Sequence, residues 1–182
     1  MNEKEKKEIS KFLSLVLRHS PQTIRIVLDE NGWADVQELI AKSAKQRRFF
    51  SMKDLEEVVI TNDKQRFAFN ADHSKIRANQ GHSIKVELNL KEKEPPSFLY
   101  HGTVAKFMQS IRKDGLMKMD RQHVHLSKDK TTAEKVGSRR GVPILLNIRS
   151  GDMFKKGFKF YLSENGVWLT DSVPANYIDF KE

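Results

Sequence analysis

The 182-residue sequence contains no cysteine, only five prolines and only two tryptophans. The absence of cysteine excludes disulfide bonds, thiol catalysis, iron–sulfur clusters and cysteine-ligated zinc sites. Long apolar runs are also missing, since FLSLVL and PILL are far shorter than the roughly 20 residues of a membrane-spanning helix. The start, MNEKEKKEIS, is charged and lacks the apolar segment of a secretory signal. We therefore expect a soluble, cytoplasmic protein with no membrane partner.

Several well-known functional motifs are absent as well. The sequence has no GxxxxGK[ST] phosphate-binding loop, no GxGxxG after a predicted strand, no nucleophile elbow and no HExxH zinc motif. These absences argue against a P-loop NTPase, a Rossmann dehydrogenase, an α/β-hydrolase and a zincin protease.

Positive charge is what the sequence has in excess. It carries 33 Lys and Arg residues against 24 Asp and Glu residues, for a formal net charge of +9 and a pI near 9.7. Such a balance favours polyanionic partners, such as nucleic acid or phosphorylated ligands. The hydrophobic content of 38% is enough for one ordinary core or two small ones.

The first half of the chain has the element order of a winged helix. Apolar residues at helical spacing predict a helix from about residue 9 to residue 17, which ends before Pro21. It is followed, in chain order, by a short strand over residues 24–28, a turn at Asn31-Gly32, a helix capped by Asp35 and Glu38, a helix capped by Ser51 and Asp54, a β-hairpin within residues 60–79 and a strand over residues 83–90.

The second half is predicted to be a mixed, mainly β domain. It follows the charged, proline-containing segment KEKEPP at residues 91–96, which is the best candidate for a linker. The expected elements, in chain order, are a strand at residues 98–100, a helix capped by Thr103 and closed by Gly115, a strand at residues 123–127, a helix capped by Thr131 and Glu134, a strand at residues 143–148, a hairpin turning at Asn165-Gly166 and a strand at residues 177–180.

Arg18 and His19 stand side by side where the first helix ends. Cations at a helix C-terminus interact favourably with the helix dipole, and this explanation is the stronger one for the dipeptide alone. The alternative is an anion clamp, in which the planar arginine fork and the imidazole both donate to phosphate oxygens.

Two further polar stretches leave similar alternatives open. Arg66, at the start of a predicted strand, is either a solvated arginine or a ligand-binding one. The segment ANQGHS at residues 78–83 is either a polar loop or a loop that passes close to a ligand, where Gly81 would allow the approach.

The corner formed by His101, Gly102 and Thr103 lies between a predicted strand and a predicted helix. Exposed N–H groups at such corners bind carboxamides and phosphates, although many similar junctions bind nothing. Arg139 and Arg140, next to Gly141, suit a phosphate-binding or base-stacking loop, although a solvated turn is the stronger explanation for these three residues alone.

Two histidines at residues 123 and 125 face the same side of a predicted strand. A metal site would need a third ligand, and none occurs at a recognisable spacing, so we expect no metal. Arg121, just upstream, makes a phosphate-facing strand the better interpretation.

Taken in order, the segments LVLRHSP, NGWADV, DKQRFAF, ANQGHS, LYHGT, RQHVHLS and VGSRRGVPILL closely resemble the RNA 2′-phosphotransferase family, the KptA/Tpt proteins. The resemblance extends from about residue 10 to residue 180, and the ordered set is far more specific than any single motif. It implies an α+β fold with an N-terminal winged-helix RNA-binding lobe at residues 1–90, a linker at 91–96 and a mainly β, ADP-ribosyltransferase-like NAD-binding lobe at 97–182.

The resemblance also implies a reaction. An internal 2′-phosphate of a tRNA-like RNA, such as the mark at a ligated tRNA splice junction, attacks C1″ of NAD⁺ and expels nicotinamide. The ribose 2″-hydroxyl of the RNA-2′-phospho-ADP-ribose intermediate then attacks the phosphorus. The products are RNA with a free 2′-hydroxyl and ADP-ribose 1″,2″-cyclic phosphate, so NAD is consumed as a co-substrate. Nothing suggests an obligate oligomer, and we expect a monomer.

Residue roles follow by matching positions to the family's motifs. The family's catalytic set of arginine, histidine, arginine and arginine corresponds to Arg18, His19, Arg66 and Arg121. The positions that correspond to NAD contacts are His101, Gly102, Thr103, His125, Ser127, Arg140 and Gly141.

One feature departs from the wider ADP-ribosyltransferase pattern. Many of those proteins carry a glutamate on a late strand, whereas the segment WLTDSVPANYI offers no clear equivalent, Asp171 being in a different context. A 2′-phosphate is already anionic near neutral pH, so its attack on NAD⁺ needs positioning and charge neutralisation rather than a general base.

Two other functions are compatible with the same sequence. One is a nucleic-acid-binding module without catalysis, but the predicted helix at residues 51–59 carries mostly acidic polar residues, which argues against duplex recognition. The other is an ADP-ribosyltransferase that leaves ADP-ribose on its acceptor.

Overall fold

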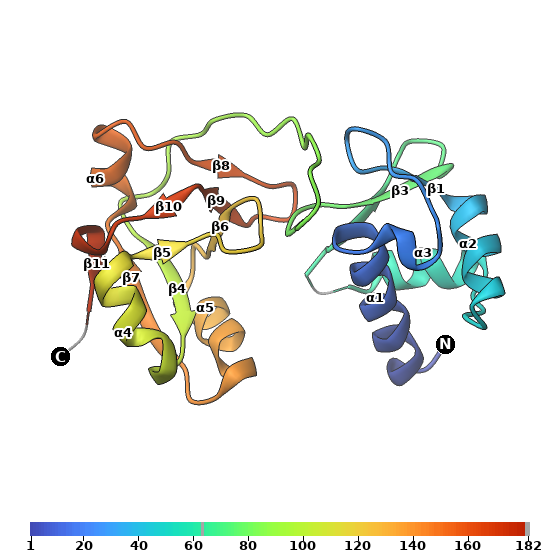
Figure 1. The fold of residues 1–182 in the computed structure, drawn as a ribbon, viewed down its shortest axis with the longest axis horizontal. Helices are drawn as coiled ribbons and strands as arrows, with labels where there is room; N and C mark the ends of the chain where they lie inside the picture. Colours follow the sequence, from blue (N-terminus) through green and yellow to red (C-terminus); the bar gives the residue numbers. More distant parts are fainter. Residues whose placement is uncertain (63, 181–182) are drawn as a thin grey trace. The chain divides into compact units, whose positions relative to one another are not determined.

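The computed structural model describes residues 1–62 and 64–180. The chain divides into two compact units, Met1–Asn89 and Leu90–Glu182. Each unit combines helices with small antiparallel sheets, so the expected α+β class is confirmed (Figure 1). The division falls directly ahead of residues 91–96, the segment predicted to be a linker. Among the described residues, no helix has both the length and the apolar character required to cross a bilayer.

The first unit is built from three α-helices and one three-stranded sheet in its described part. The sheet order is β1-β3-β2, and both pairings are antiparallel. The elements are α1 (Glu3–Arg18), η1 (Pro21–Thr23), β1 (Ala34–Asp35), α2 (Val36–Lys45), α3 (Met52–Ile60), β2 (Phe67–Phe69) and β3 (Lys75–Ala78). The predicted hairpin is thus β2 with β3, and the three helices occur in the expected order.

The ends of the helices are set by local side chains. Asn2 and Glu5 form a capping box at the start of α1, and Ser51 and Asp54 form the predicted one at α3. Asp35 caps α2 by accepting a hydrogen bond from the Glu38 amide at 2.7 Å, but among the described contacts the Glu38 side chain does not complete the predicted capping box. Each such cap satisfies amide groups that the first turn of a helix leaves unpaired.

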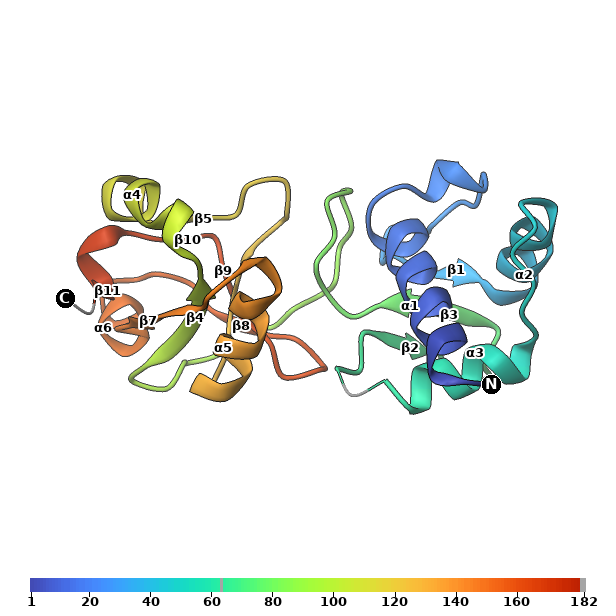
Figure 2. The same cartoon turned by 90° about the horizontal axis from the view of Figure 1, so that it is seen from below.

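The core of the first unit forms where α1 packs against α3 and β3 (Figure 2). Leu13, Val16 and Leu17 of α1 are completely buried, at the spacing that places them on one helix face. Burying a side chain of this size contributes about 2 kcal/mol. This burial fixes the axis of α1, and therefore fixes where its C-terminal residues Arg18 and His19 lie.

Two predicted strands of the first unit are wrong. Residues 24–28, all described, join no sheet: Ile24 and Ile26 are buried, but Arg25 has a φ of 58°, which is incompatible with a continuous strand. Residues 83–90 likewise form no described strand, and only Val86 among them is buried. Alternating burial occurs in both segments without the ladder of hydrogen bonds that defines a strand.

The second unit carries most of the strands. Its described sheets have the orders β11-β7-β4, β6-β9-β8 and β10-β5. The elements are β4 (Leu99–Thr103), α4 (Ala105–Asp114), β5 (Leu116–Met117), β6 (Val124–Leu126), α5 (Lys130–Gly137), η2 (Ser138–Arg140), β7 (Ile144–Ile148), α6 (Ser150–Lys155), β8 (Tyr161–Leu162), β9 (Trp168–Thr170), β10 (Ser172–Val173), η3 (Ala175–Tyr177) and β11 (Ile178–Asp179).

The second unit is organised around β4 and β7, which pair antiparallel from Leu99 opposite Ile148 to Thr103 opposite Ile144. Helix α5 packs on β4 and β7, as Figure 1 shows. This packing is so close that a Cβ atom at Gly102 would lie 1.8 Å from the Ala133 carbonyl oxygen. A glycine is therefore required at the point where β4 meets α5.

Several predictions for the second unit need correction. Thr103 does not cap a helix, because it belongs to β4 and pairs with β7; Val104 is the N-cap residue of α4. Asp129, rather than Thr131, caps α5 by accepting from the Thr132 amide at 2.7 Å. Helix α6 was not predicted. The strands expected from the segments FLY, HVHLS, PILLNI and YIDF, the hairpin turning at Asn165-Gly166 and the helix end at Gly115 are confirmed.

The predicted linker segment is hydrogen-bonded within the second unit. The Lys93 amide donates to the Phe160 carbonyl at 2.8 Å, and Glu92 forms an antiparallel bridge with Tyr161. Pro95 is buried.

Candidate functional site

Three of the four residues predicted to be catalytic lie in one cluster of the first unit. Arg18 is the last residue of α1, and His19 is its C-cap residue. Arg66 directly precedes β2, and its carbonyl accepts a 3.4 Å hydrogen bond from Nη2 of Arg18, a residue 48 positions away in the sequence. The Arg18 guanidinium also lies 5.7 Å from the centre of the Phe67 ring. Tertiary structure therefore groups these cations.

The Arg66 side chain is oriented by a neighbouring amide. Its Nη1 donates to Oδ1 of Asn62 at 3.2 Å, and Asn62 also accepts from the Lys64 amide. The backbone of Arg66 is fixed from the other side, because the Asn79 amide donates to its carbonyl at 2.9 Å. Backbone and side chain are thus held independently, which presents the guanidinium in a defined direction.

The polar segment at residues 78–83 completes this cluster. It leaves β3, turns at Gly81 with a φ of 88°, and brings Ser83 against the end of α1. The Ser83 amide donates to the Arg18 carbonyl at 2.9 Å, and the Ser83 hydroxyl is hydrogen-bonded to Nδ1 of His19 at 2.9 Å. The loop contacts the predicted catalytic residues, so it is more than a solvent-exposed connection.

His82 is buried within the same cluster. Only 1% of its surface is exposed, and neither ring nitrogen has a hydrogen-bond partner among the described residues. Burial, reinforced by the nearby charges of Arg18, His19 and Arg77, lowers the pKa of His82 from 6.5 to about 4. His82 is consequently neutral at physiological pH, and the positive potential around it comes from its neighbours.

Arg77 is a further cation that the sequence-based reasoning missed. It lies on β3, between the buried residues Ile76 and Ala78, and its guanidinium packs 4.5 Å from the centre of the Trp33 ring. In the sequence, a charged residue between two apolar residues of a predicted strand was the signal that could have drawn attention to Arg77. Together with Arg18, His19 and Arg66 it gives the first unit a concentration of donors suited to an anion.

In the second unit, His101, Arg121 and His125 form a chain of hydrogen bonds. Nδ1 of His101 lies 3.1 Å from the His125 carbonyl oxygen, which can only accept, so His101 carries its proton on Nδ1. The Arg121 guanidinium donates to Nδ1 of His125, because arginine has no acceptor. Neutral His125 therefore carries its proton on Nε2, and the tautomers of both rings are fixed.

Strand pairing brings the other predicted cofactor residues to this place. Reciprocal hydrogen bonds of 2.9 and 2.8 Å join Tyr100 and Ser127, so β4 and the end of β6 lie side by side. His101 and Gly102 follow on β4, and Thr103 is buried at its end. The structure thus gathers the His101–Thr103 corner, His125, Ser127 and Arg121 in one region of the second unit.

Arg140 and Gly141 lie at the edge of the same region. The Arg140 guanidinium packs 5.6 Å from the centre of the Phe107 ring, and Gly141 has a φ of 137°. Burial is the main cause of a lowered pKa at His101, and the charges of Arg121 and Arg140 act in the same direction. A neutral imidazole beside two guanidinium groups suits a ligand that is polar and anionic.

The paired histidines His123 and His125 have different partners in the structure. Within the described residues, no group of three or more His, Asp or Glu side chains is arranged to hold a metal ion. His123 instead packs edge-on against Tyr161, with 5.7 Å between the ring centres.

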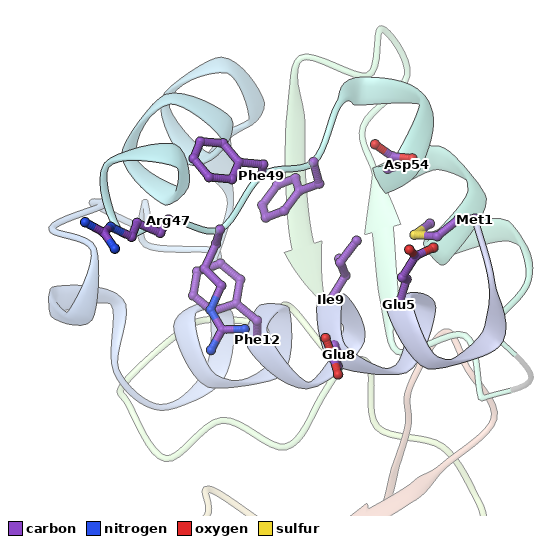
Figure 3. A pocket seen from close by; sticks show the side chains of 10 residues that line it. Met1, Glu5, Glu8, Ile9, Phe12, Arg47, Phe49 and Asp54 are labelled. Carbon is purple, nitrogen blue, oxygen red and sulfur yellow. The ribbon is translucent and has the colours of Figure 1, made fainter.

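A separate pocket of about 440 Å³ in the first unit contains none of the predicted site residues. Figure 3 shows the side chains that line it, which come from α1, from the loop between α2 and α3, and from the start of α3. Glu5, Glu8 and Asp54 face it together with Arg47 and Arg48. Because charges of both signs line it, the pocket offers an anion no clear preference.

Comparison with known proteins gives a consistent answer. Residues 4–172 match the family described as RNA 2′-phosphotransferase, Tpt1/KptA family. A Flavobacterium johnsoniae protein named as a probable RNA 2′-phosphotransferase is 67% identical over 181 residues, covering 100% of both chains. Proteins of the same name from Fusobacterium nucleatum and Burkholderia pseudomallei are 53% and 52% identical, covering 95% and 94% of this chain and 97% and 93% of their own. The chain therefore belongs to the RNA 2′-phosphotransferase family, Tpt1/KptA.

Proposed function

We propose that this protein is an NAD-dependent RNA 2′-phosphotransferase, with a winged-helix first unit that binds RNA and an ADP-ribosyltransferase-like second unit that binds NAD. Membership of the Tpt1/KptA family supports the phosphotransfer itself. The observation that carries the residue roles is the cluster of Arg18, His19 and Arg66. The Arg66 carbonyl accepts a hydrogen bond from Arg18 across 48 positions, while Ser83 holds the His19 ring and Asn62 holds the Arg66 guanidinium.

The first step needs charge neutralisation more than proton transfer. The RNA 2′-phosphate, already an anion, attacks C1″ of NAD⁺, and the bond from C1″ to the nicotinamide nitrogen breaks. Nicotinamide leaves with the bonding electron pair, which neutralises the positive charge of its ring. Arg18, His19 and Arg66 hold and orient the phosphate, because fixed donors aimed at an anion need no reorganisation during the reaction.

The second step breaks the bond between phosphorus and the RNA 2′-oxygen. The ribose 2″-hydroxyl attacks the phosphorus and loses its proton, while the RNA 2′-oxygen leaves and gains one. The guanidinium groups reduce the repulsion between an oxygen nucleophile and an anionic phosphodiester, and His19 is the residue of the set able to give or take a proton. The products of this step are RNA with a 2′-hydroxyl and ADP-ribose 1″,2″-cyclic phosphate.

The residues of the second unit fit the other substrate. A dinucleotide with a diphosphate needs cationic donors, which Arg121 and Arg140 supply. It also needs polar groups of fixed tautomer for its uncharged parts, which His101 and His125 supply. In this proposal, Arg121 also contributes to the phosphate during the transfer. The substrate RNA is tRNA-like, and the protein acts as a monomer.

The proposal is tested with a short RNA that carries one internal 2′-phosphate, incubated with and without NAD⁺ and analysed by mass spectrometry. We expect NAD-dependent loss of the phosphate. A stable, heavier RNA that keeps ADP-ribose would instead indicate an ADP-ribosyltransferase, and RNA binding without chemistry would indicate a binding module.

Two arginine variants of the second unit sharpen the test. Arg121→Ala should slow the reaction about a hundredfold or more, or accumulate the ADP-ribosylated RNA, because a charged donor to the reacting phosphate is lost. Arg112→Ala removes an exposed guanidinium on α4 that packs on Phe180 and should leave the rate unchanged. Equal rates for the two variants would exclude the role given to Arg121.

A further inference from the structure

The contact between Ser83 and the end of α1 combines two hydrogen bonds from one residue to two adjacent catalytic candidates. The Ser83 amide donates to the Arg18 carbonyl, and the Ser83 hydroxyl is bonded to Nδ1 of His19, each at 2.9 Å. Ser83 lies 64 positions after His19 in the sequence. The first of these bonds belongs to the backbone, so only the second depends on the identity of the side chain.

The segment that carries Ser83 is firmly held on both sides of its turn. Before Gly81, Asn79 is buried, its amide donates to the Arg66 carbonyl, and its Nδ2 donates to the Gln65 carbonyl at 2.7 Å. After Gly81, His82 is 1% exposed. A hydroxyl mounted on so constrained a backbone can fix the direction of a neighbouring ring.

We infer that Ser83 is a positioning residue for His19, and that its hydroxyl fixes the orientation in which His19 meets the RNA phosphate. This inference rests on the function proposed above. When the neutral imidazole carries its proton on Nε2, where it can be donated to the phosphate, the Ser83 hydroxyl donates to Nδ1. When the ring is protonated, Nδ1–H donates to the same hydroxyl oxygen.

The positioning role requires a group that can both donate and accept a hydrogen bond. A hydroxyl is both donor and acceptor, so it keeps the ring in one place while Nε2 gains or loses a proton. A backbone carbonyl in the same position could only accept, and would hold the proton on Nδ1 instead. The arrangement therefore suits a histidine that changes its protonation state between the two steps.

The test compares Ser83→Ala, Ser83→Thr and Ser110→Ala. Ser110 is exposed on α4 and bonds only to the Phe107 carbonyl in its own helix, so its variant controls for loss of a hydroxyl. We expect Ser83→Ala to lower kcat roughly five- to tenfold, the effect of losing one hydrogen bond. The KM for RNA should change little, because the role inferred for Ser83 acts through His19 and not through a contact with the RNA. Ser83→Thr should restore most of the rate, and Ser110→Ala should match the wild type.

A second measurement reports on His19 directly. Imidazole nitrogen chemical shifts of His19, measured by NMR as a function of pH, distinguish the two neutral tautomers. We expect the His19 ring-nitrogen shifts and their pH dependence to differ between the wild type and Ser83→Ala, with a corresponding change in the pH–rate limb that belongs to His19. A purely structural role for Ser83 would move neither.

The outcomes separate this inference from the proposed function. If the wild type removes the 2′-phosphate but Ser83→Ala retains its kcat, or if the His19 shifts are the same in both, the positioning role is wrong and the function stands. If Ser83→Thr is as slow as Ser83→Ala, the hydroxyl is not the active feature and the inference also fails. If the wild type does not remove the phosphate at all, the proposed function fails and the role of Ser83 fails with it.

Discussion

Acidification should destabilise the first unit through His82, a histidine that the fold keeps neutral. The side chain is 1% exposed, and its pKa is lowered from 6.5 to about 4, first by burial and then by the charges of Arg18, His19 and Arg77. In the unfolded chain the same imidazole regains its ordinary pKa. The folded state therefore binds a proton less readily than the unfolded state.

The sign and size of the effect follow from this difference. Stability contributed by the neutral ring is fully present above pH 6.5 and is lost as the pH falls through that value toward 4. A difference of one pKa unit corresponds to about 1.4 kcal/mol, so the loss between pH 7 and pH 4 amounts to about 3 kcal/mol. That is a large part of the roughly 5–15 kcal/mol that stabilises a typical domain.

The assay is urea unfolding at pH 7, 6, 5 and 4, comparing the protein with its His82→Gln variant. Trp33 lies in the first unit and Trp168 in the second. Both proteins therefore carry Trp168→Phe, so that tryptophan fluorescence follows the first unit alone. Carboxylates titrate in both proteins and cancel in the difference. We expect the His82 protein to lose about 3 kcal/mol more than the variant over this range. Parallel curves, or a greater loss in the variant, would refute the reasoning.

Three other predictions concern the packing and the helix cap that hold the two units, and two of them have a control variant. Gly102→Ala should destabilise the second unit by about 3 kcal/mol or more, because its Cβ would lie 1.8 Å from a backbone oxygen. Gly166→Ala, with open space and a φ of 76°, should cost only about 1 kcal/mol, and equal costs would contradict the close packing. In thermal or urea unfolding, Leu17→Ala should cost roughly 2–5 kcal/mol, whereas Leu15→Ala, at a side chain 42% exposed, should cost much less. Ser51→Ala should remove about 1 kcal/mol through loss of the α3 cap, and no change would show that the cap contributes nothing.

Local features of the fold were predictable from the sequence. The caps at Asp35 and Ser51 were found because each involves a side chain and an amide only three residues apart. Asn165-Gly166 was found for a similar reason, since the turn and its left-handed glycine are encoded in adjacent residues.

The errors arose where distant parts of the chain decide the local structure. Thr103 looked like a helix cap, but its pairing with Ile144 of β7 extends the strand through it. Residues 24–28 alternate in burial like a strand, but the positive φ of Arg25 interrupts the extended conformation that a strand requires. Helix α6 is six residues long, too short for apolar periodicity to reveal it.

For the candidate site, too, neighbouring residues were predictable from the sequence and long-range contacts were not. Arg18 and His19 were noticeable because they are adjacent. Nothing in the spacing of the sequence connects them with Arg66, and only the ordered resemblance to a known family made that connection. Ser83 was missed because a hydrogen bond across 64 positions leaves no mark in the local sequence. Arg77 stands between two apolar residues of a predicted strand, but the local sequence does not show that its guanidinium packs on Trp33.

The fate of the phosphorus atom tests the central claim most directly. An RNA with a single radiolabelled 2′-phosphate is incubated with the protein, and the labelled products are separated with and without NAD⁺. We predict that the label moves from RNA to ADP-ribose 1″,2″-cyclic phosphate only when NAD⁺ is present. Label that stays in RNA, or that appears as inorganic phosphate without NAD⁺, would contradict the proposed reaction.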